Sequence, residues 1–220
     1  MKDREKLAKY IGAFMMLVHV SGMIGVMTSY RSFFVDLTAV NLILTFILMV
    51  YFHEEKRKVF WLYMVVIAVL GFTVEVLGVN TGIPFGEYSY GFPFGPQIWG
   101  TPPVIGLNWF ILTYGVAYLM RRSKVSKILK ALIVGLLVTS LDVIIEPVAI
   151  NLGYWTWVAE HVPIQNYVTW FVCISIFSYW IYHVEKESDK WKNPMVIWLI
   201  AAQVVYFVGV CIYVLSLIHI

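Results

Sequence analysis

The chain has 220 residues, of which 60% are hydrophobic and 13% are charged. Soluble globular domains carry about 25% charged residues, so this composition excludes an ordinary soluble domain and indicates an integral membrane protein. The formal net charge of +3 is small. The basic residues fall in short links between apolar segments, where they mark topology and contact anionic lipid, so they do not indicate nucleic-acid binding.

Seven apolar runs follow one another along the chain, each approaching the roughly 20 residues that a helix needs to cross the hydrocarbon core. They cover residues 9–27, 37–52, 59–78, 104–120, 131–150, 166–183 and 195–218. The first run follows a basic segment but lacks a small-residue cleavage site, so we expect a retained helix rather than a signal peptide. The sequence therefore predicts an all-α, polytopic bundle of seven transmembrane helices, forming a single integral membrane domain over residues 1–220.

Lysine and arginine are concentrated in alternate links. The N-terminus and the links 53–58, 121–130 and 185–192 hold all of the 16 basic residues except Arg31. By the positive-inside rule, this distribution predicts a multi-pass protein of the cell membrane with a cytoplasmic N-terminus and an outward C-terminus.

The two long links on the opposite face, residues 79–103 and 151–165, are rich in glycine, proline and aromatic residues and contain no Lys or Arg. Repeated Gly and Pro prevent a long helix, and irregular backbone at membrane depth needs cover from protein or a cavity. We therefore expect both links to fold over the bundle mouth as a lid. For any single Trp or Tyr, a place in an interfacial aromatic belt is an equal alternative.

Three acidic residues, Glu75, Asp142 and Glu146, fall inside the apolar runs, where ionisable side chains are costly and usually functional. The rise of a helix places Glu75 and Glu146 at a similar depth near the outward ends of their helices. Asp142 lies one turn deeper and, at a spacing of i, i+4, points from the same helix face as Glu146. Three further side chains reach this level from neighbouring helices, namely Asn108, Trp109 and Trp170.

With no basic residue predicted nearby, burial favours the neutral form of these acids, and two neighbouring carboxylates resist ionising together. We expect a proton donor facing an apolar pocket, with a second carboxylate that accepts a proton or holds water. A neutral acid hydrogen-bonded between helices is the structural alternative. Glu146 also precedes Pro147, so its side chain could instead satisfy backbone groups freed by a kink.

The remaining polar residues and cysteines indicate function less clearly than the three acids do. His19 lies near mid-membrane, where it is either a proton relay or, more commonly for a lone histidine, a packing residue. Cys173 and Cys211 fall within apolar runs and predict neither a disulfide nor a metal site. The sequence has no nucleotide-binding loop and no paired-aspartate motif for Mg²⁺, so we expect neither a cofactor nor a metal.

The acids and aromatic residues recur in order within short motifs. The sequence contains Glu75-x2-Gly78-x3-Gly82-Ile83-Pro84-Phe85-Gly86-x-Tyr88-x-Tyr90, Gly100-x-Pro102, Asn108-Trp109, Asp142-x3-Glu146-Pro147-x5-Gly153-x-Trp155-x-Trp157, Pro163-x2-Asn166 and Trp170. This combination resembles the carotenoid 1,2-hydratase family, whose archaeal members include the bisanhydrobacterioruberin hydratases. The resemblance covers about residues 75–170 and extends over the rest through the helix count.

The resemblance implies the addition of water to the terminal isoprenoid double bond of an acyclic C40 or C50 carotenoid, through a tertiary carbocation and without a cofactor. Asp142 or Glu146 is the expected proton donor, Glu75 the water-side base, and Asn108 the residue that orients water. The expected substrate-binding residues are Tyr88, Tyr90, Trp99, Asn108, Trp109, Trp155, Trp157, Asn166 and Trp170. Those expected to stabilise the cation through their π faces are Tyr88, Trp99, Trp109 and Trp155.

Three other functions stay open. A lycopene-type cyclase would start from the same cation, which an internal double bond then captures. A non-enzymatic carotenoid-binding protein would hold the pigment without turnover, and a transporter would also use buried acids. The run 195–218 has no lysine for a Schiff base, which argues against retinal chemistry. The expected partners are the acyclic carotenoid, water, membrane lipids and other enzymes of the carotenoid pathway, with no nucleic acid.

Overall fold

The computed structural model describes residues 2–54, 57–185 and 191–218. Three basic residues of the predicted cytoplasmic links, Lys56, Lys186 and Lys190, lie outside the described residues. The helices are α1 (Lys2–Gly25), α2 (Arg31–Asp36), α3 (Thr38–Phe52), α4 (Lys58–Thr81), α5 (Val104–Met120), α6 (Lys127–Leu152), α7 (Ile164–Val184) and α8 (Met195–Ile218). The remaining elements are the strands β1 (Tyr88–Tyr90) and β2 (Trp155–Trp157) and a short 3-10 helix, η1 (Phe92–Phe94).

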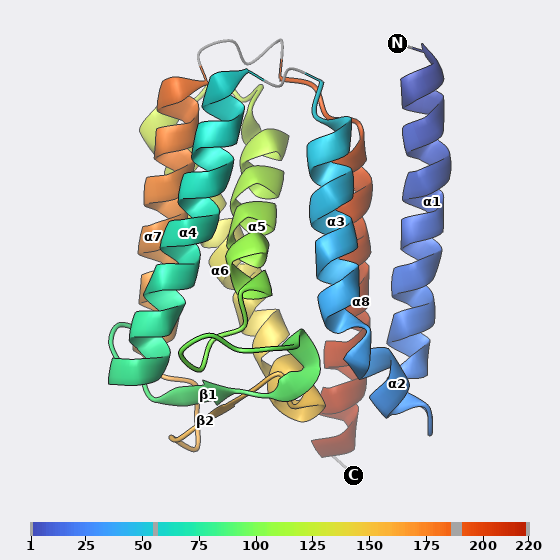
Figure 1. The fold of residues 1–220 in the computed structure, drawn as a ribbon, viewed down its shortest axis with the longest axis vertical. Helices are drawn as coiled ribbons and strands as arrows, with labels where there is room; N and C mark the ends of the chain where they lie inside the picture. Colours follow the sequence, from blue (N-terminus) through green and yellow to red (C-terminus); the bar gives the residue numbers. More distant parts are fainter. Residues whose placement is uncertain (1, 55–56, 186–190, 219–220) are drawn as a thin grey trace.

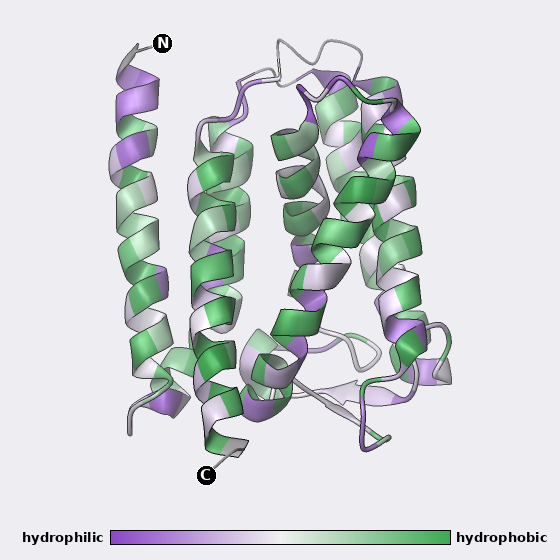
Figure 2. Cartoon of the chain, turned by 180° about the vertical axis from the view of Figure 1, so that it is seen from behind, coloured by the Kyte–Doolittle hydropathy of each residue, from purple (hydrophilic) through white to green (hydrophobic). Residues whose placement is uncertain are grey.

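The seven predicted helices are confirmed as the seven long helices of an all-α bundle (Figure 1). Within the described chain, six segments are long and apolar enough to span a membrane, and one of them joins α2 to α3 as Arg31–Phe52. Helix α2 lies between the predicted runs 9–27 and 37–52, where no helix was expected. Hydrophobic residues make up most of the helices (Figure 2), and many large aliphatic side chains, such as Leu17 and Leu136, are exposed. This is the surface expected of a polytopic membrane protein.

The remaining long helix, α5, is shorter, with 17 residues. It packs against α3, α4, α6, α7 and α8, and every residue from Trp109 to Tyr118 is buried. Because its neighbours shield α5 from lipid, its backbone and ends are covered by protein, and it need not match the full hydrocarbon thickness.

Two glycines direct the chain away from the helices that carry the acids. Gly82 follows α4 with φ 70°, and Gly153 follows α6 with φ 71°. A side chain would be strained in this left-handed conformation, whereas glycine adopts it freely and commonly ends helices this way. Both turns lead into the links predicted to form the lid.

The two links lie together across one end of the bundle and confirm the expected lid (Figure 1). They also form a structure that was not predicted, a two-stranded antiparallel sheet of β1 and β2. In its register Tyr88 pairs with Trp157, Ser89 with Thr156, and Tyr90 with Trp155. We call this sheet the ribbon.

Candidate active site

Glu75 is held beneath the ribbon from α4, with 3% of its surface exposed. Its Oε2 accepts hydrogen bonds from the hydroxyls of Tyr88, at 2.5 Å, and Tyr90, at 2.7 Å. Its Oε1 accepts from Nε1 of Trp109 at 2.9 Å. Both oxygens of this buried carboxyl are therefore occupied by donors.

Trp109 is in turn fixed by its packing. Its ring stacks on that of Trp170 from α7, with centroids 4.1 Å apart and planes inclined by 2°. It also lies against Gly71 of α4, where a Cβ would collide with the Trp109 side chain. These two contacts hold the indole in place while its N–H donates to Glu75.

Asp142 and Glu146 project from the same face of α6, as the i, i+4 spacing predicted, and both are buried. Oε2 of Glu146 accepts from Nε1 of Trp155 and Nε1 of Trp157, each at 3.0 Å. The Nδ2 group of Asn166 lies between the two acids, donating to Oδ2 of Asp142 at 2.9 Å and to Oε1 of Glu146 at 3.3 Å. These Glu146 bonds go to side-chain donors and not to the backbone near Pro147, which was the alternative role considered from the sequence.

The ribbon connects the two groups of acids. Alternate residues of a strand point to the same face, so the four aromatic residues share one face while Ser89 and Thr156 are exposed on the other. The tyrosines of β1 donate to Glu75, and the tryptophans of β2 donate to Glu146. Burial is the largest cause that raises the pKa of Tyr88 and Tyr90, and the charge of Glu75 is the next. Both phenols therefore stay protonated and can donate.

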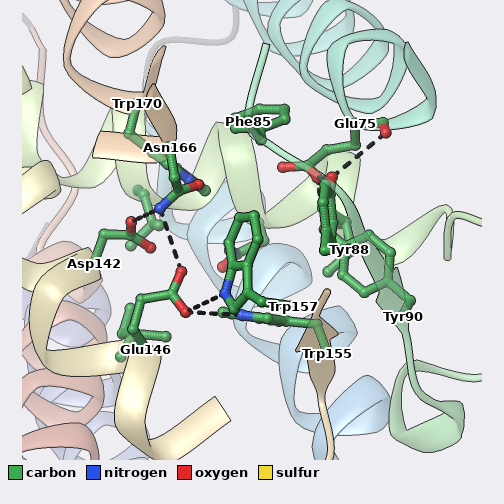
Figure 3. Close-up of a pocket in the computed structure, with 14 residues that line it drawn as sticks. Glu75, Phe85, Tyr88, Tyr90, Asp142, Glu146, Trp155, Trp157, Asn166 and Trp170 are labelled. Carbon is green, nitrogen blue, oxygen red and sulfur yellow. Dashed lines mark hydrogen bonds between the residues drawn. The ribbon is translucent and has the colours of Figure 1, made fainter. Parts of the chain in front are cut away.

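A small pocket lies between the acids (Figure 3), with a volume of about 40 Å³. This is enough room for a water molecule. Predicted site residues make up most of its wall: Glu75, Tyr88, Tyr90, Asn108, Asp142, Glu146, Trp155, Trp157, Asn166 and Trp170. We call this space the acid pocket.

A second, larger cavity of about 340 Å³ adjoins the acid pocket and has a mainly apolar wall. It lies between α1, α3 and α8 on one side and α5 and α6 on the other. Five residues line both spaces, namely Ile105, Asn108, Leu112, Ile145 and Trp155. The two spaces are therefore neighbours that share part of their walls.

Two predicted site residues lie elsewhere. Trp109 does not line the acid pocket but supports it through Glu75 and Trp170. Trp99 is not brought to the acids, because its side chain is 72% exposed and its residue adopts a positive φ of 50° in the turn that precedes α5. The remaining lining residues, which were not predicted, are Phe85, Ile105, Leu112 and Ile145. Aliphatic side chains in a hydrophobic helix give no signal of this role.

None of the three acids forms an ion pair within the described part of the chain. The ion pair found among the described residues joins Arg57 to Glu185. Arg57 precedes α4, and Glu75 lies about 25 Å further along that helix. The bonds found at these acids come from neutral hydrogen-bond donors rather than from cations.

Comparison of the sequence with known proteins shows the family of the chain. Residues 37–220 match the family described as carotenoid biosynthesis protein. The chain is also similar to bisanhydrobacterioruberin hydratase from Haloarcula japonica, with 25% identity over 177 residues that cover 76% of this chain and 59% of the relative. The chain thus spans about three fifths of the length of that relative. No solved structure matches the chain. Because the family match extends over most of its length, the chain belongs to the carotenoid biosynthesis protein family.

Proposed function

We propose that this protein is a hydratase that adds water to the terminal isoprenoid double bond of an acyclic C40 or C50 carotenoid. The observation that carries the proposal is the junction of two spaces, an acid pocket with three buried carboxyl groups and a large apolar cavity. The chemistry named for the Haloarcula relative, a carotenoid hydration, supports it. The reacting end of the chain would meet the acid pocket at the residues that line both spaces, with the adjoining hydrocarbon in the cavity and water in the acid pocket.

The number of donors at each acid distinguishes their roles. Glu75 and Glu146 each accept three hydrogen bonds, which favour the ionised form. Asp142 accepts one, from Asn166, and its Oδ1 has no donor among the described residues. Two adjacent carboxylates do not readily ionise together. Asp142 is therefore the acid that keeps a proton, and we assign it as the proton donor.

Glu75 and Glu146 differ in the kind of donor that they meet. Indole N–H groups only donate, and the amide that reaches Glu146 does so through its NH2 group, so Glu146 stays a carboxylate. Two of the three donors at Glu75 are phenols, which can turn and accept. Glu75 can thus take up a proton, whereas Glu146 provides fixed negative charge beside a developing cation.

The reaction balances without a redox step. Asp142 transfers its proton to one carbon of the terminal alkene, and the π electrons form the new C–H bond, leaving a tertiary carbocation. Glu146 and the indole face of Trp155 stabilise that cation. Water held by Asn108 forms the C–O bond and loses its proton to Glu75. Water in the acid pocket returns this proton to Asp142, so the net change is alkene plus water to tertiary alcohol.

The distribution of basic residues supports a reaction site near one face of the cell membrane and predicts which face that is. With the N-terminus in the cytoplasm, the ribbon and the acid pocket lie toward the outward face of the cell membrane. A cysteine placed at Ser89 in the ribbon should then react with an impermeant thiol reagent added to intact cells, because Ser89 is exposed. Labelling only after cell lysis would show that the ribbon faces the cytoplasm, opposite to the proposed orientation.

Expression in a lycopene-producing host tests the function. We expect pigments heavier than lycopene by one water for each hydrated end, and no such product with Asp142→Asn. A product of unchanged mass with a cyclised end would identify a cyclase. Bound but unchanged lycopene would identify a carotenoid-binding protein. Either result would refute the hydratase.

A further inference from the structure

The wall of the large cavity is buried on one side and exposed on the other. On α5 and α6 its aliphatic lining residues are buried, and only 4% of Leu112 is exposed. The exposed lining residues all lie on α1 or directly before α3, and they are Phe14, Leu17, Ser21 and Leu37. A residue that both lines a cavity and is exposed lies at the edge of that cavity. The cavity therefore opens between α1 and α3, and we call this opening the α1–α3 mouth.

The packing of α1 explains why this side is open. Helix α1 stands at the edge of the bundle (Figure 1) and packs mainly against α8. Gly12 lies so close to Trp198 of α8 that a Cβ at this position would collide with the indole. This close approach to α8 leaves another face of α1 free to border the cavity. Phe14, Leu17 and Ser21 are spaced by three and four residues, so they share that face.

The link between α1 and α3 at the mouth is weak. Asn41 of α3 bonds to His19 of α1, with 3.2 Å between Nδ2 and Nε2. Near the cytoplasmic ends of the two helices, Arg4 donates to the carbonyl oxygen of Tyr51. A hydrogen bond between neutral groups contributes little net stability. The exposed residues of α1 between these two bonds, Phe14 and Leu17, can therefore move relative to α3 at small cost.

The mouth faces lipid on the side of the bundle that carries the ribbon. Its residues on α1 fall in the second half of that helix, and Leu37 precedes α3. Helix α1 ends and helix α3 begins at the ribbon end of the bundle (Figure 1). Large apolar side chains beside the mouth, such as Ile24 and Val40, are also exposed. An apolar surface of this kind suits contact with lipid tails rather than with water.

We propose that the α1–α3 mouth is the portal through which the isoprenoid chain enters the large cavity from the lipid and through which the product leaves. The inference rests on the hydratase proposed above, because it takes the large cavity as the substrate site. Exposing a long hydrocarbon to water is unfavourable in proportion to its area, whereas a molecule dissolved among lipid tails passes this mouth without meeting water. Phe14, Leu17 and Ser21 are the residues that control its passage.

Rates of loading and release test the inference without turnover. The purified protein in detergent micelles is mixed with lycopene in the same detergent. Loading is followed as quenching of tryptophan fluorescence, because Trp155 lines the cavity. Release is followed as the recovery of that fluorescence when the loaded protein is diluted into micelles without lycopene. The amplitude of the quenching gives the occupancy at equilibrium.

Variants at the mouth change its width in both directions. Leu17→Phe with Ser21→Phe narrows the mouth, and we expect loading and release to slow together by about tenfold, a rise in the barrier of about 1.4 kcal/mol. Occupancy at equilibrium should stay unchanged, because a portal alters both rates equally. Phe14→Ala widens the mouth and should speed both rates. Ile24→Phe, exposed on the same helix but outside the cavity wall, is the matched control and should behave as wild type.

Two results would overturn the portal. Wild-type rates in both the narrowed and the widened variant would show that the chain enters elsewhere. A change in release and occupancy without a matching change in loading would show that these residues hold the bound chain instead of controlling its passage.

Product mass separates this inference from the proposed function. Hydration of lycopene by a protein whose loading rate is the same in all the variants would refute the portal alone. Loading and release that follow the width of the mouth, in a protein that never forms a hydrated product, would refute the hydratase and leave the portal.

Discussion

Tyr88 and Trp157 stand directly opposite each other in the ribbon, yet each donates a hydrogen bond to a different buried carboxylate, Glu75 on α4 and Glu146 on α6. Their rings lie 5.0 Å apart. Two helices far apart in the sequence are thereby held at a fixed separation by one cross-strand pair. The acid pocket owes its width to this pair and to the neighbouring pair, Tyr90 and Trp155.

The first expectation concerns the proton donor. Asp142→Asn keeps the size of the side chain but removes the acid, and should lower the hydration rate by about 10²- to 10⁴-fold, the contribution of general acid catalysis. The rate is measured from product formation in membranes that contain lycopene. Asp36→Asn, an exposed acid on α2, is the matched control and should retain full activity. Near wild-type turnover by Asp142→Asn would show that another residue donates the proton.

The second prediction concerns the indole N–H groups that donate to Glu146. Trp157→Phe keeps an aromatic ring but removes the N–H, and we expect about a 10- to 100-fold loss, since a hydrogen bond to a charged group contributes about 1.5–3 kcal/mol. In a Glu146→Gln background the same change should have little further effect, because the charge is already gone. Trp61→Phe, on an exposed face of α4, serves as the control. Additive losses in the double variant would show that Trp157 acts independently of Glu146.

The third prediction concerns the ionisation of Tyr88 and Tyr90 with rising pH. Because burial raises the pKa of Tyr88 and Tyr90, the fold favours their neutral forms. Their contribution to stability is full below the ordinary tyrosine pKa of about 10 and is lost only as pH rises through the higher folded values. Ultraviolet titration of tyrosinate should therefore show no difference between wild type and Tyr88→Phe/Tyr90→Phe up to about pH 10. A difference below that pH would mean that these phenols are not shielded by the ribbon.

The fourth concerns the support of Trp109. Gly71→Ala would raise the helix propensity of α4, yet the new methyl group would meet the indole of Trp109. We expect a net loss of about 1–3 kcal/mol, typical of overpacking, seen as a lower midpoint of thermal unfolding in detergent. Gly22→Ala is the matched control, since its Cβ would lie 3.6 Å from the Tyr206 ring, an ordinary contact. If the two variants unfold at the same midpoint temperature, Trp109 does not restrict the residue at position 71.

Much of this arrangement follows from the sequence because the membrane imposes strong rules. Apolar runs long enough to span lipid gave the helices, and the cost of burying charge identified Glu75, Asp142 and Glu146. All three acids line one pocket. Their shared depth could be anticipated because a helix rises by a constant amount per residue.

The ribbon was harder to predict. Each strand has three residues, too few for a reliable alternating pattern, although Tyr-Ser-Tyr and Trp-Thr-Trp do alternate aromatic with small polar residues. The partners also lie in links separated by two helices, so nothing local specifies their pairing. Trp99 shows the converse problem, since an aromatic residue in a lid link can face away from the site, and its 72% exposure depends on the turn that carries it.

The ribbon limits how the two lid links can change in length. Because side chains alternate between faces, one residue inserted within β1 or β2 would turn the following aromatic side chains outward. The acid that this strand bonds, Glu75 for β1 or Glu146 for β2, would then lose donors. Insertions in the stretch between η1 and α5 would leave the pairing intact, so a change of length there would keep the two strands in register.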